Sequence, residues 1–303
     1  MARPIDPAIK FRFRIWMVLV CLWGAGFNIF GSPAPPIYAA EENSWQALEP
    51  GLWYGQFLSP QRSESGDSIV RVLRIDPRFF ECKLLSVSAV ADQQPMTTAQ
   101  WSRRYRLKAA INASMYQKDY RTSVSLMKSP GHINNPRMSK DMTILAFDRR
   151  TTDVPPVKII DRECDDFSRW RKQYRTLVQS IRMISCTGRN VWSEQPQRWS
   201  TAAIATDRQG HVLFIYVASP FSTHDLIENL KRLPLDIQRA MYAEGGLPAQ
   251  LYINAGGTEL EFAGGRKISG GEEVEAAHPW AIPNVIGIVP IRNPVPSGSS
   301  GAE

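Results

Sequence analysis

The fold is decided by the stretch Ser200-Thr201-Ala202-Ala203-Ile204-Ala205-Thr206-Asp207-Arg208-Gln209-Gly210-His211-Val212-Leu213-Phe214-Ile215-Tyr216-Val217-Ala218. Its two apolar runs, 201–206 and 211–218, are rich in residue types that favour β-strands. Between them, Gln209-Gly210 is a turn signal typical of a β-hairpin. We therefore expect two strands joined by a tight turn.

Similar patterns extend on both sides of this hairpin. They predict further strands at 68–75, 80–90, 108–112, 123–127, 142–147, 178–184 and 284–289, and a second hairpin from 250–254 and 259–262. Helices are expected at 97–105, capped by Thr97 or Thr98, and after Ser222, which forms a capping-box pattern with Asp225. Another helix over 235–242 would have Pro234 in its first turn. The predicted order of elements is a series of strands, then a few helices, then strands again. Because this order lacks strict βα alternation, it predicts an α+β fold. We expect a single domain with a mixed β-sheet core and a few packed helices.

Composition divides the 303 residues into four parts. Residues 1–40 predict a signal peptide or an N-terminal membrane anchor, and 41–65 an irregular lead-in. Residues 66–292 are expected to form the folded domain. Residues 293–303, rich in Pro, Ser and Gly, predict a disordered tail.

The N-terminus has the pattern of an export signal. Lys10, Arg12 and Arg14 precede an apolar stretch at 15–30. Its 16 residues are fewer than the roughly 20 that span a bilayer, and they fit the apolar region of a signal peptide. We expect an exported, periplasmic protein. If the segment stays uncleaved, residues 15–30 would instead tether the domain to the inner membrane.

The formal net charge of +7 partly reflects this leader. Without residues 1–40, the chain keeps 32 Lys or Arg and 28 Asp or Glu, a net charge of +4. No Lys/Arg-rich run stands out, which argues against nucleic acid as a partner.

The cysteines predict one disulfide and no zinc site. Cys164 and Cys186 flank a segment of about twenty residues and are the expected pair, since export permits disulfides. Cys82 lies in an apolar run and is expected to be a buried free thiol. The chain has no CxxC, HExxH or Gly-rich phosphate loop, so we expect no cofactor and no metal held through sulfur. A metal held by oxygen ligands stays open, with Glu244, Asp119 and Asp225 as candidate ligands.

The strongest candidate site is Tyr242-Ala243-Glu244-Gly245-Gly246. A lone carboxylate precedes two glycines, which permit positive φ and close approach of a ligand. Catalytic groups concentrate on such connections between rigid elements. The alternative is an ordinary helix C-terminus capped by glycine, with Glu244 merely solvated.

Further polar residues lie at the ends of predicted strands or in the first turn of a helix: Asn112, Lys128, His132, Asn134, Arg182, Thr201 and His224. Histidine is scarce, so His132 and His224 are the candidates for acid–base chemistry. Each has a plainer alternative. Asn112 and Asn134 could cap turns, Arg182 could be an ion-paired strand residue, and His224 a neutral surface group.

Three motifs together resemble the phosphodiester glycosidase family. Residues 108–116, ending in Ile111-Asn112-Ala113-Ser114-Met115-Tyr116, resemble its INGGFF strand and turn. Residues 199–207 resemble its RTAIG strand, and 242–246 its NLDGG turn. Order and spacing agree from about residue 66 to 290. The chain looks like a divergent bacterial branch of this family, which is also described as exopolysaccharide-biosynthesis-like.

The resemblance implies hydrolysis of a glycosyl phosphodiester or an envelope glycan. It assigns Asn112, Thr201, Gly245 and Gly246 to substrate binding and Glu244 to catalysis. The chain departs from the family at several positions: Ser200 for Arg, Ala113 and Ser114 for the double glycine, Tyr242 for Asn, and Glu244 for Asp. Lys128, His132 and Arg182 are the candidates to replace the missing cation.

These departures keep a second class of function open. The same fold could serve a non-catalytic envelope glycan-binding protein, or a membrane-tethered interaction protein if 15–30 remains attached. A phosphate leaving group needs little protonation, so one carboxylate with donors for the anion would be sufficient for hydrolysis.

Overall fold

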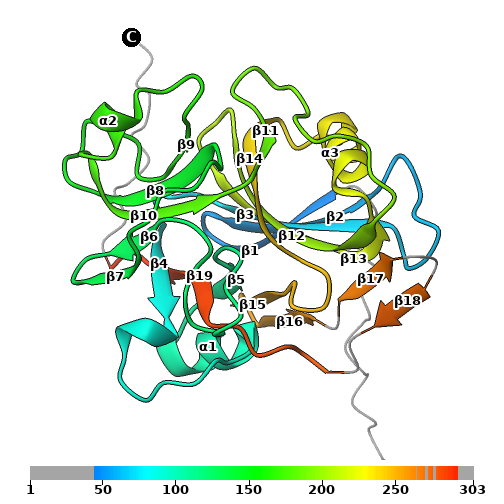
Figure 1. Ribbon diagram of the computed structural model, residues 1–303, viewed down its shortest axis with the longest axis horizontal. Coiled ribbons are helices and arrows are strands. Elements are labelled where there is room, and N and C mark those ends of the chain that lie inside the picture. The colour runs from blue at the N-terminus through cyan, green and yellow to red at the C-terminus, as the bar shows by residue number, and fades with distance from the viewer. Residues whose placement is uncertain (1–43, 264, 270–271, 276–277, 293–303) are drawn as a thin grey trace, which may run out of the picture. The chain divides into compact units, whose positions relative to one another are not determined.

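A computed structural model describes residues 44–263, 265–269, 272–275 and 278–292 (Figure 1). The expected leader at 1–40, with its apolar stretch at 15–30, and the expected tail at 293–303 lie outside these residues. Among the helices that are described, none is long and apolar enough to cross a membrane.

The largest sheet contains the hairpin that opened the sequence. Its strand order begins with β1 (Ser44–Glu49), β2 (Leu52–Leu58) and β3 (Ile69–Ile75), and continues through β13 (Val212–Phe221), β12 (Arg198–Asp207), β14 (Ile237–Gly245) and β11 (Arg182–Ile184). A short hairpin, β17 (Arg266–Ser269) and β18 (Glu272–Glu275), pairs with the start of β12. The predicted hairpin is confirmed, because Thr201–Thr206 pairs with Val212–Val217.

Two smaller sheets complete the fold. One has the order β7 (His132–Asn135), β6 (Met127–Ser129), β10 (Tyr174–Ser180), β8 (Thr143–Arg149) and β9 (Lys158–Asp161). The other has the order β16 (Thr258–Phe262), β15 (Leu251–Ala255), β5 (Ala109–Asn112), β19 (Asn284–Pro290) and β4 (Phe80–Ser86). Helices are few: α1 (Thr98–Tyr105), α2 (Phe167–Trp170), α3 (Thr223–Arg232) and the 3-10 turn η1 (Val87–Ala89).

The α+β class is confirmed in this strand-rich form, but the expected mixed sheet is wrong. Every pairing between the described strands is antiparallel. Parallel neighbours require crossovers of a dozen or more residues, usually helical. This chain has few helices and connects many of its strands by short hairpin turns instead.

Two further expectations are corrected. The lead-in at 41–65 is not irregular, because 44–58 forms β1 and β2 at the edge of the large sheet. The helix expected over 235–242 is strand β14, and its interior residues Ala240, Met241 and Ala243 have no exposed surface. A strand buried on both faces is continuously apolar, so its periodicity cannot be distinguished from that of a buried helix.

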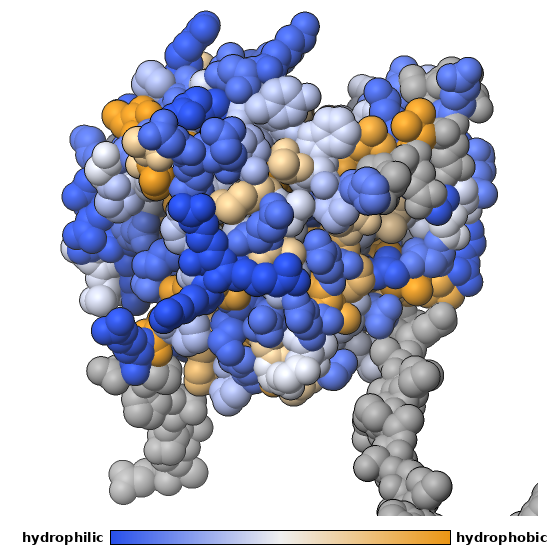
Figure 2. Space-filling view, turned by 90° about the horizontal axis from the view of Figure 1, so that it is seen from below, coloured by the Kyte–Doolittle hydropathy of each residue, from blue (hydrophilic) through white to orange (hydrophobic). Residues whose placement is uncertain are grey.

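One hydrophobic core joins the three sheets. It contains Tyr54 and Ile204 from the large sheet, Phe147 from the second, and Ile111 and Ile286 from the third, all buried. The opposite face of the large sheet is covered by α3, whose Leu226, Ile227 and Leu230 pack against strand residues of β3 and β13. Ser222 caps this helix, as predicted. Figure 2 shows one face of the molecule, largely hydrophilic with separate apolar areas, as expected when the apolar strands bury their side chains in these cores.

Candidate functional site

The Glu-Gly-Gly turn lies at the end of β14, which is hydrogen-bonded on both sides. Glu244 pairs with Ala202 of β12, and Gly245 pairs with Thr201. Between Ala202 and Ala203 the register shifts, so β14 has one extra residue, Ala243, immediately before the carboxylate. Such bulges bend a strand and redirect the next side chain, and they are common beside active sites.

Gly245 is required by its surroundings. A Cβ at this position would lie 1.7 Å from the Tyr242 hydroxyl oxygen and 2.6 Å from the indole of Trp199. Gly246 adopts a φ of +72°, and its N–H donates to the Ser200 carbonyl over 2.8 Å. The two glycines therefore have different roles. Gly245 lets aromatic rings lie close to the backbone, and Gly246 adopts the positive φ at which the chain turns.

Glu244 is a buried carboxyl without a counter-charge. Its side chain is 8% exposed, and Oε1 accepts a hydrogen bond from the Gly245 N–H over 3.0 Å. No ion pair involves Glu244 within the described part of the chain. Burial raises the pKa of Glu244 from its usual 4.5 to about 7, and the single backbone hydrogen bond offsets only part of this effect. At neutral pH the group can therefore exchange a proton.

Aromatic side chains surround the carboxyl. Burial and the Glu244 charge both raise the pKa of Tyr116 and of Tyr242, which places both phenols within electrostatic reach of the carboxylate. The Trp199 Nε1 atom is buried, and a side-chain hydrogen bond between Trp199 and Tyr242 offsets part of the rise in the pKa of Tyr242. Trp192 packs against Tyr242 with ring centroids 5.7 Å apart. Aromatic faces beside a buried carboxyl are features of a ligand site rather than of a simple turn.

Three of the residues matched to the family motifs support this turn. Asn112, at the end of β5, donates to the Pro248 carbonyl over 2.9 Å and accepts from the Gln250 N–H over 2.8 Å. Thr201 is buried beside Gly245, and Ser200 receives the Arg266 N–H over 2.6 Å. Asn112 therefore fastens the segment after the turn to another sheet, and its assignment to substrate binding stays a prediction.

The other predicted residues lie in separate contacts. Lys128, His132 and Asn134 belong to the β6–β7 hairpin, where His132 Nε2 lies 2.8 Å from Ser88 Oγ and Asn134 Nδ2 donates to both Ser86 and Ser88. His224 Nδ1 lies 3.3 Å from an Asp225 carboxylate oxygen. None of these side chains contacts Glu244 among the interactions of the described residues, so their roles at the substrate also stay predictions.

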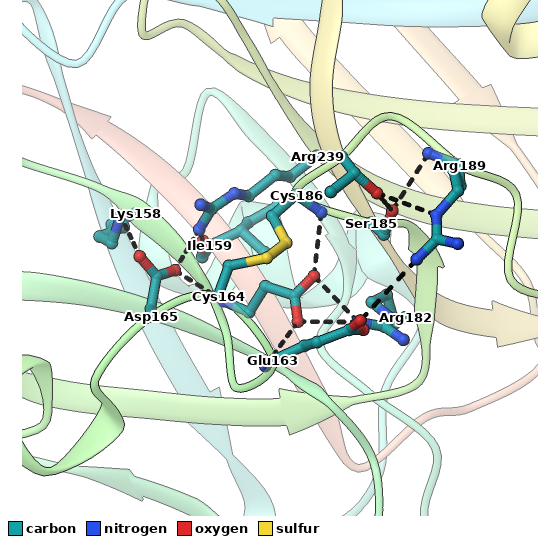
Figure 3. Close-up of a disulfide and its surroundings, with 12 residues drawn as sticks. Lys158, Ile159, Glu163, Cys164, Asp165, Arg182, Ser185, Cys186, Arg189 and Arg239 are labelled. Carbon is teal, nitrogen blue, oxygen red and sulfur yellow. Dashed lines mark hydrogen bonds and ion pairs between the residues drawn. A yellow bond between two sulfur atoms is a disulfide. The ribbon is translucent and has the colours of Figure 1, made fainter.

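Arg182 lies beside the disulfide (Figure 3). Cys164 and Cys186 are joined, as predicted, and Arg182 forms ion pairs with Asp161 over 2.9 Å and with Glu163. Cys82 is a buried free thiol, also as predicted. The plainer alternative for Arg182, an ion-paired strand residue, therefore matches its surroundings.

One cluster of possible metal-ligand residues occurs in the described residues: Asp161 with Cys164 and Cys186. Its two sulfur atoms are joined to each other and cannot act as thiolate ligands. Asp119 accepts hydrogen bonds from Arg121 and Thr122 in its own loop, and Asp225 lies beside His224. The described residues therefore do not assemble Glu244, Asp119 and Asp225 into one ligand set.

A depression near the turn is not lined by Glu244. It has a volume of about 460 Å³ and is bordered by Ile181, Arg182, Trp192 and Glu194. Its Trp192 ring contacts Tyr242, whose hydroxyl borders Gly245. The candidate site is therefore the carboxyl of Glu244 with its aromatic neighbours, because this carboxyl is buried without a counter-charge.

Sequence reasoning missed Tyr116, Trp199 and Trp192 as site residues. Tyr116 and Trp199 stand inside or directly beside the motifs quoted above, so their position was a usable signal. Nothing in the sequence marks Trp192, which reaches Tyr242 only through the fold.

The motif segments lie within a region of the chain that matches a known protein family. A family model described as "Phosphodiester glycosidase" matches residues 105–289, more than half of the chain. The chain belongs to the phosphodiester glycosidase family. The match includes the Asn112, Thr201 and Glu244 segments and confirms the resemblance found in the sequence.

Two solved structures have a similar fold. The catalytic domain of zebrafish N-acetylglucosamine-1-phosphodiester alpha-N-acetylglucosaminidase, auto-inhibited by its pro-peptide, superposes with a TM-score of 0.58 at 12% identity, covering 81% of this chain and 87% of the zebrafish chain. A hypothetical protein from Synechocystis gives a TM-score of 0.51 at 14% identity, covering 79% of this chain and 62% of its own. No curated protein matches this phosphodiester glycosidase homologue in sequence.

Proposed function

We propose that the chain is an exported hydrolase of the cell envelope that cleaves a glycosyl phosphodiester, with Glu244 as its catalytic carboxyl. The observation that carries the proposal is a buried carboxyl without an ion pair within the family's own turn motif, where burial raises the pKa of Glu244 to about 7. Structural carboxyls are normally solvated or ion-paired, whereas catalytic ones have their pKa brought near the working pH.

In this mechanism the ionised Glu244 acts as a general base. It takes a proton from a water molecule, whose oxygen attacks the anomeric carbon of the sugar. The bond between that carbon and the phosphate oxygen breaks, and its electron pair leaves with the phosphate. The products are the free sugar, a phosphate monoester and a proton held by Glu244. The leaving phosphate is already a stable anion, so no general acid is required.

Neutral donors would hold the phosphate where the family has an arginine. Ser200 at that position is engaged with the Ala218 carbonyl and the Arg266 N–H. The Trp199 Nε1–H, which neighbours the Tyr242 hydroxyl, and the Tyr116 hydroxyl are the neutral donors that we assign to the phosphate. Buried donors of this kind stabilise a developing negative charge strongly, because water does not compete with them.

The test is a screen of the purified domain against glycosyl-1-phosphodiesters and envelope glycans. We expect hydrolysis by the wild type and by Glu228→Gln, a control at a partly exposed residue, and no turnover by Glu244→Gln. The activity of the wild type should fall as the pH is lowered through about 7, because protonation removes the base. Turnover that survives Glu244→Gln would contradict the mechanism. Equal binding by both proteins without hydrolysis would favour the glycan-binding alternative.

Export is supported by the disulfide, which persists in oxidising compartments. Cell fractionation with N-terminal sequencing tests it. A soluble periplasmic protein beginning near residue 41 is the expected result, and an intact N-terminus in the membrane fraction would support the tethered alternative.

A further inference from the structure

A second depression is lined by cations from three chain segments. Lys128 and His132 come from the β6–β7 hairpin, Arg150 follows β8, and Arg175 lies in β10. We call this the basic depression. Its volume is about 420 Å³, and its remaining lining residues are Ser129, Pro130, Gly131 and Ile133. No acidic side chain lines it.

Carboxylates lie next to the basic depression rather than in it, because Arg175 also lines an adjoining depression together with Glu81 and Asp148. Within the described residues, no carboxylate forms an ion pair with Lys128, Arg150 or Arg175. A carboxylate of the adjoining strand, Asp148, instead receives the Thr176 hydroxyl and does not line the depression. This contrasts with Arg182 and Arg239, which are both ion-paired.

The hairpin that presents Lys128 and His132 is firmly held. Lys128 carries its positive charge, because burial and the nearby Arg121 lower the pKa of His132. Asn134 binds Ser86 and Ser88, and His132 meets Ser88 as well. At the tip, Gly131 adopts a φ of +73° with no atom near its missing Cβ, so the backbone turns without filling the depression. The cations are therefore presented on a positioned turn rather than on a free loop.

We propose that the basic depression binds the phosphate group of a phosphorylated sugar, at a site that shares no residue with the Glu244 turn. Two guanidinium groups can each give paired hydrogen bonds to phosphate oxygens, and Lys128 adds a point charge. The volume is in the range of small-ligand pockets. The cations come from separate segments around a concavity, which suits one anionic group better than an extended polymer backbone. The proposal does not depend on the reaction assigned to Glu244.

Titration calorimetry of the full chain tests this, with glucose 1-phosphate, inorganic phosphate and glucose as probes. We expect glucose 1-phosphate to bind more tightly than inorganic phosphate, and glucose not to bind. Loss of one charge-assisted contact in Arg175→Gln or Lys128→Gln should weaken binding by about tenfold or more. The exposed Arg62→Gln, with the same change in charge, should bind as the wild type does. None of these variants changes a residue of the Glu244 turn, which keeps this test separate from the hydrolysis test.

Three results would overturn the proposal. Unchanged affinity in both Arg175→Gln and Lys128→Gln would remove the depression as the site. Equal affinity for inorganic phosphate and glucose 1-phosphate would show that no sugar is recognised. Ile133 is 61% exposed beside Lys128, so a membrane surface is the competing partner. Binding to phosphatidylglycerol vesicles that Ile133→Ser abolishes, without measurable binding of glucose 1-phosphate, would establish that alternative instead.

Discussion

Replacing Glu244 by glutamine should stabilise the protein at alkaline pH. Glutamine has nearly the same shape and keeps an oxygen to accept the Gly245 N–H, so the packing is preserved. What disappears is the cost of ionising a buried carboxyl. Burial raises the pKa of Glu244 from 4.5 to about 7, a difference of about 2.5 pH units, and each unit corresponds to about 1.4 kcal/mol.

The sign follows from proton linkage. Below about pH 4.5 the carboxyl is protonated in both the folded and the unfolded chain, so its ionisation has no effect. As the pH rises from 4.5 to 7, the unfolded chain releases the proton while the folded chain retains it, and stability falls. Above pH 7 the full cost of about 3 kcal/mol is present.

Urea unfolding at pH 5 and pH 8 measures this effect. Glu244→Gln should gain about 3 kcal/mol over the wild type at pH 8, and less than about 1 kcal/mol at pH 5. Glu228→Gln, at a partly exposed residue that pairs with Lys231, should show no such gain. If Glu244→Gln differs from the wild type by the same amount at both pH values, Glu244 is not the buried, unpaired acid described here.

Three further predictions concern the frame of the site. Gly245→Ala should unfold or severely destabilise the domain, because the added Cβ would overlap the Tyr242 hydroxyl. Gly246→Ala has open space for its Cβ but must adopt a positive φ. It should lower the free energy of unfolding by about 1 kcal/mol, as measured by thermal unfolding. Asn112→Ala should lower the free energy of unfolding in urea by about 2–4 kcal/mol, because it leaves the Pro248 carbonyl and the Gln250 N–H without their partner. A loss below about 0.5 kcal/mol would show that these two hydrogen bonds are dispensable. Replacing Cys164 and Cys186 together by serine should lower the free energy of unfolding by about 3 kcal/mol, because the disulfide closes a loop across a sequence separation of 22. An unchanged urea unfolding transition would show that the disulfide does not stabilise the fold.

Much of the fold could be predicted from local patterns. The 201–218 hairpin, the Thr97 and Ser222 caps and the 250–262 hairpin all depend on neighbouring residues, and all are present. Local pattern failed where tertiary burial decides. β14 is apolar on both faces because sheet neighbours flank it and core packs above and below, so its sequence also suited a helix.

Only those site residues that are neighbours in the sequence could be predicted. Glu244 and its glycines stand in a recognisable turn, but which side chains meet there depends on pairing between distant strands. Tyr116 reaches the carboxylate from the segment after β5, and Trp199 from the start of β12. Lys128 and Arg182 have suitable chemistry for an anion, yet the topology places them in other clusters, which their sequence positions could not reveal.

The place of β14 between β12 and β11 also limits how the site can move. Its backbone is hydrogen-bonded to β12 on one side and β11 on the other, so the chain that carries Glu244 cannot open without breaking the large sheet. Amide protons of Met241 and Tyr242 should accordingly exchange with solvent only through global unfolding. Adaptation to a ligand must therefore come from rotation of the surrounding tyrosine and tryptophan rings, while the carboxylate stays at a fixed position to which the substrate must fit.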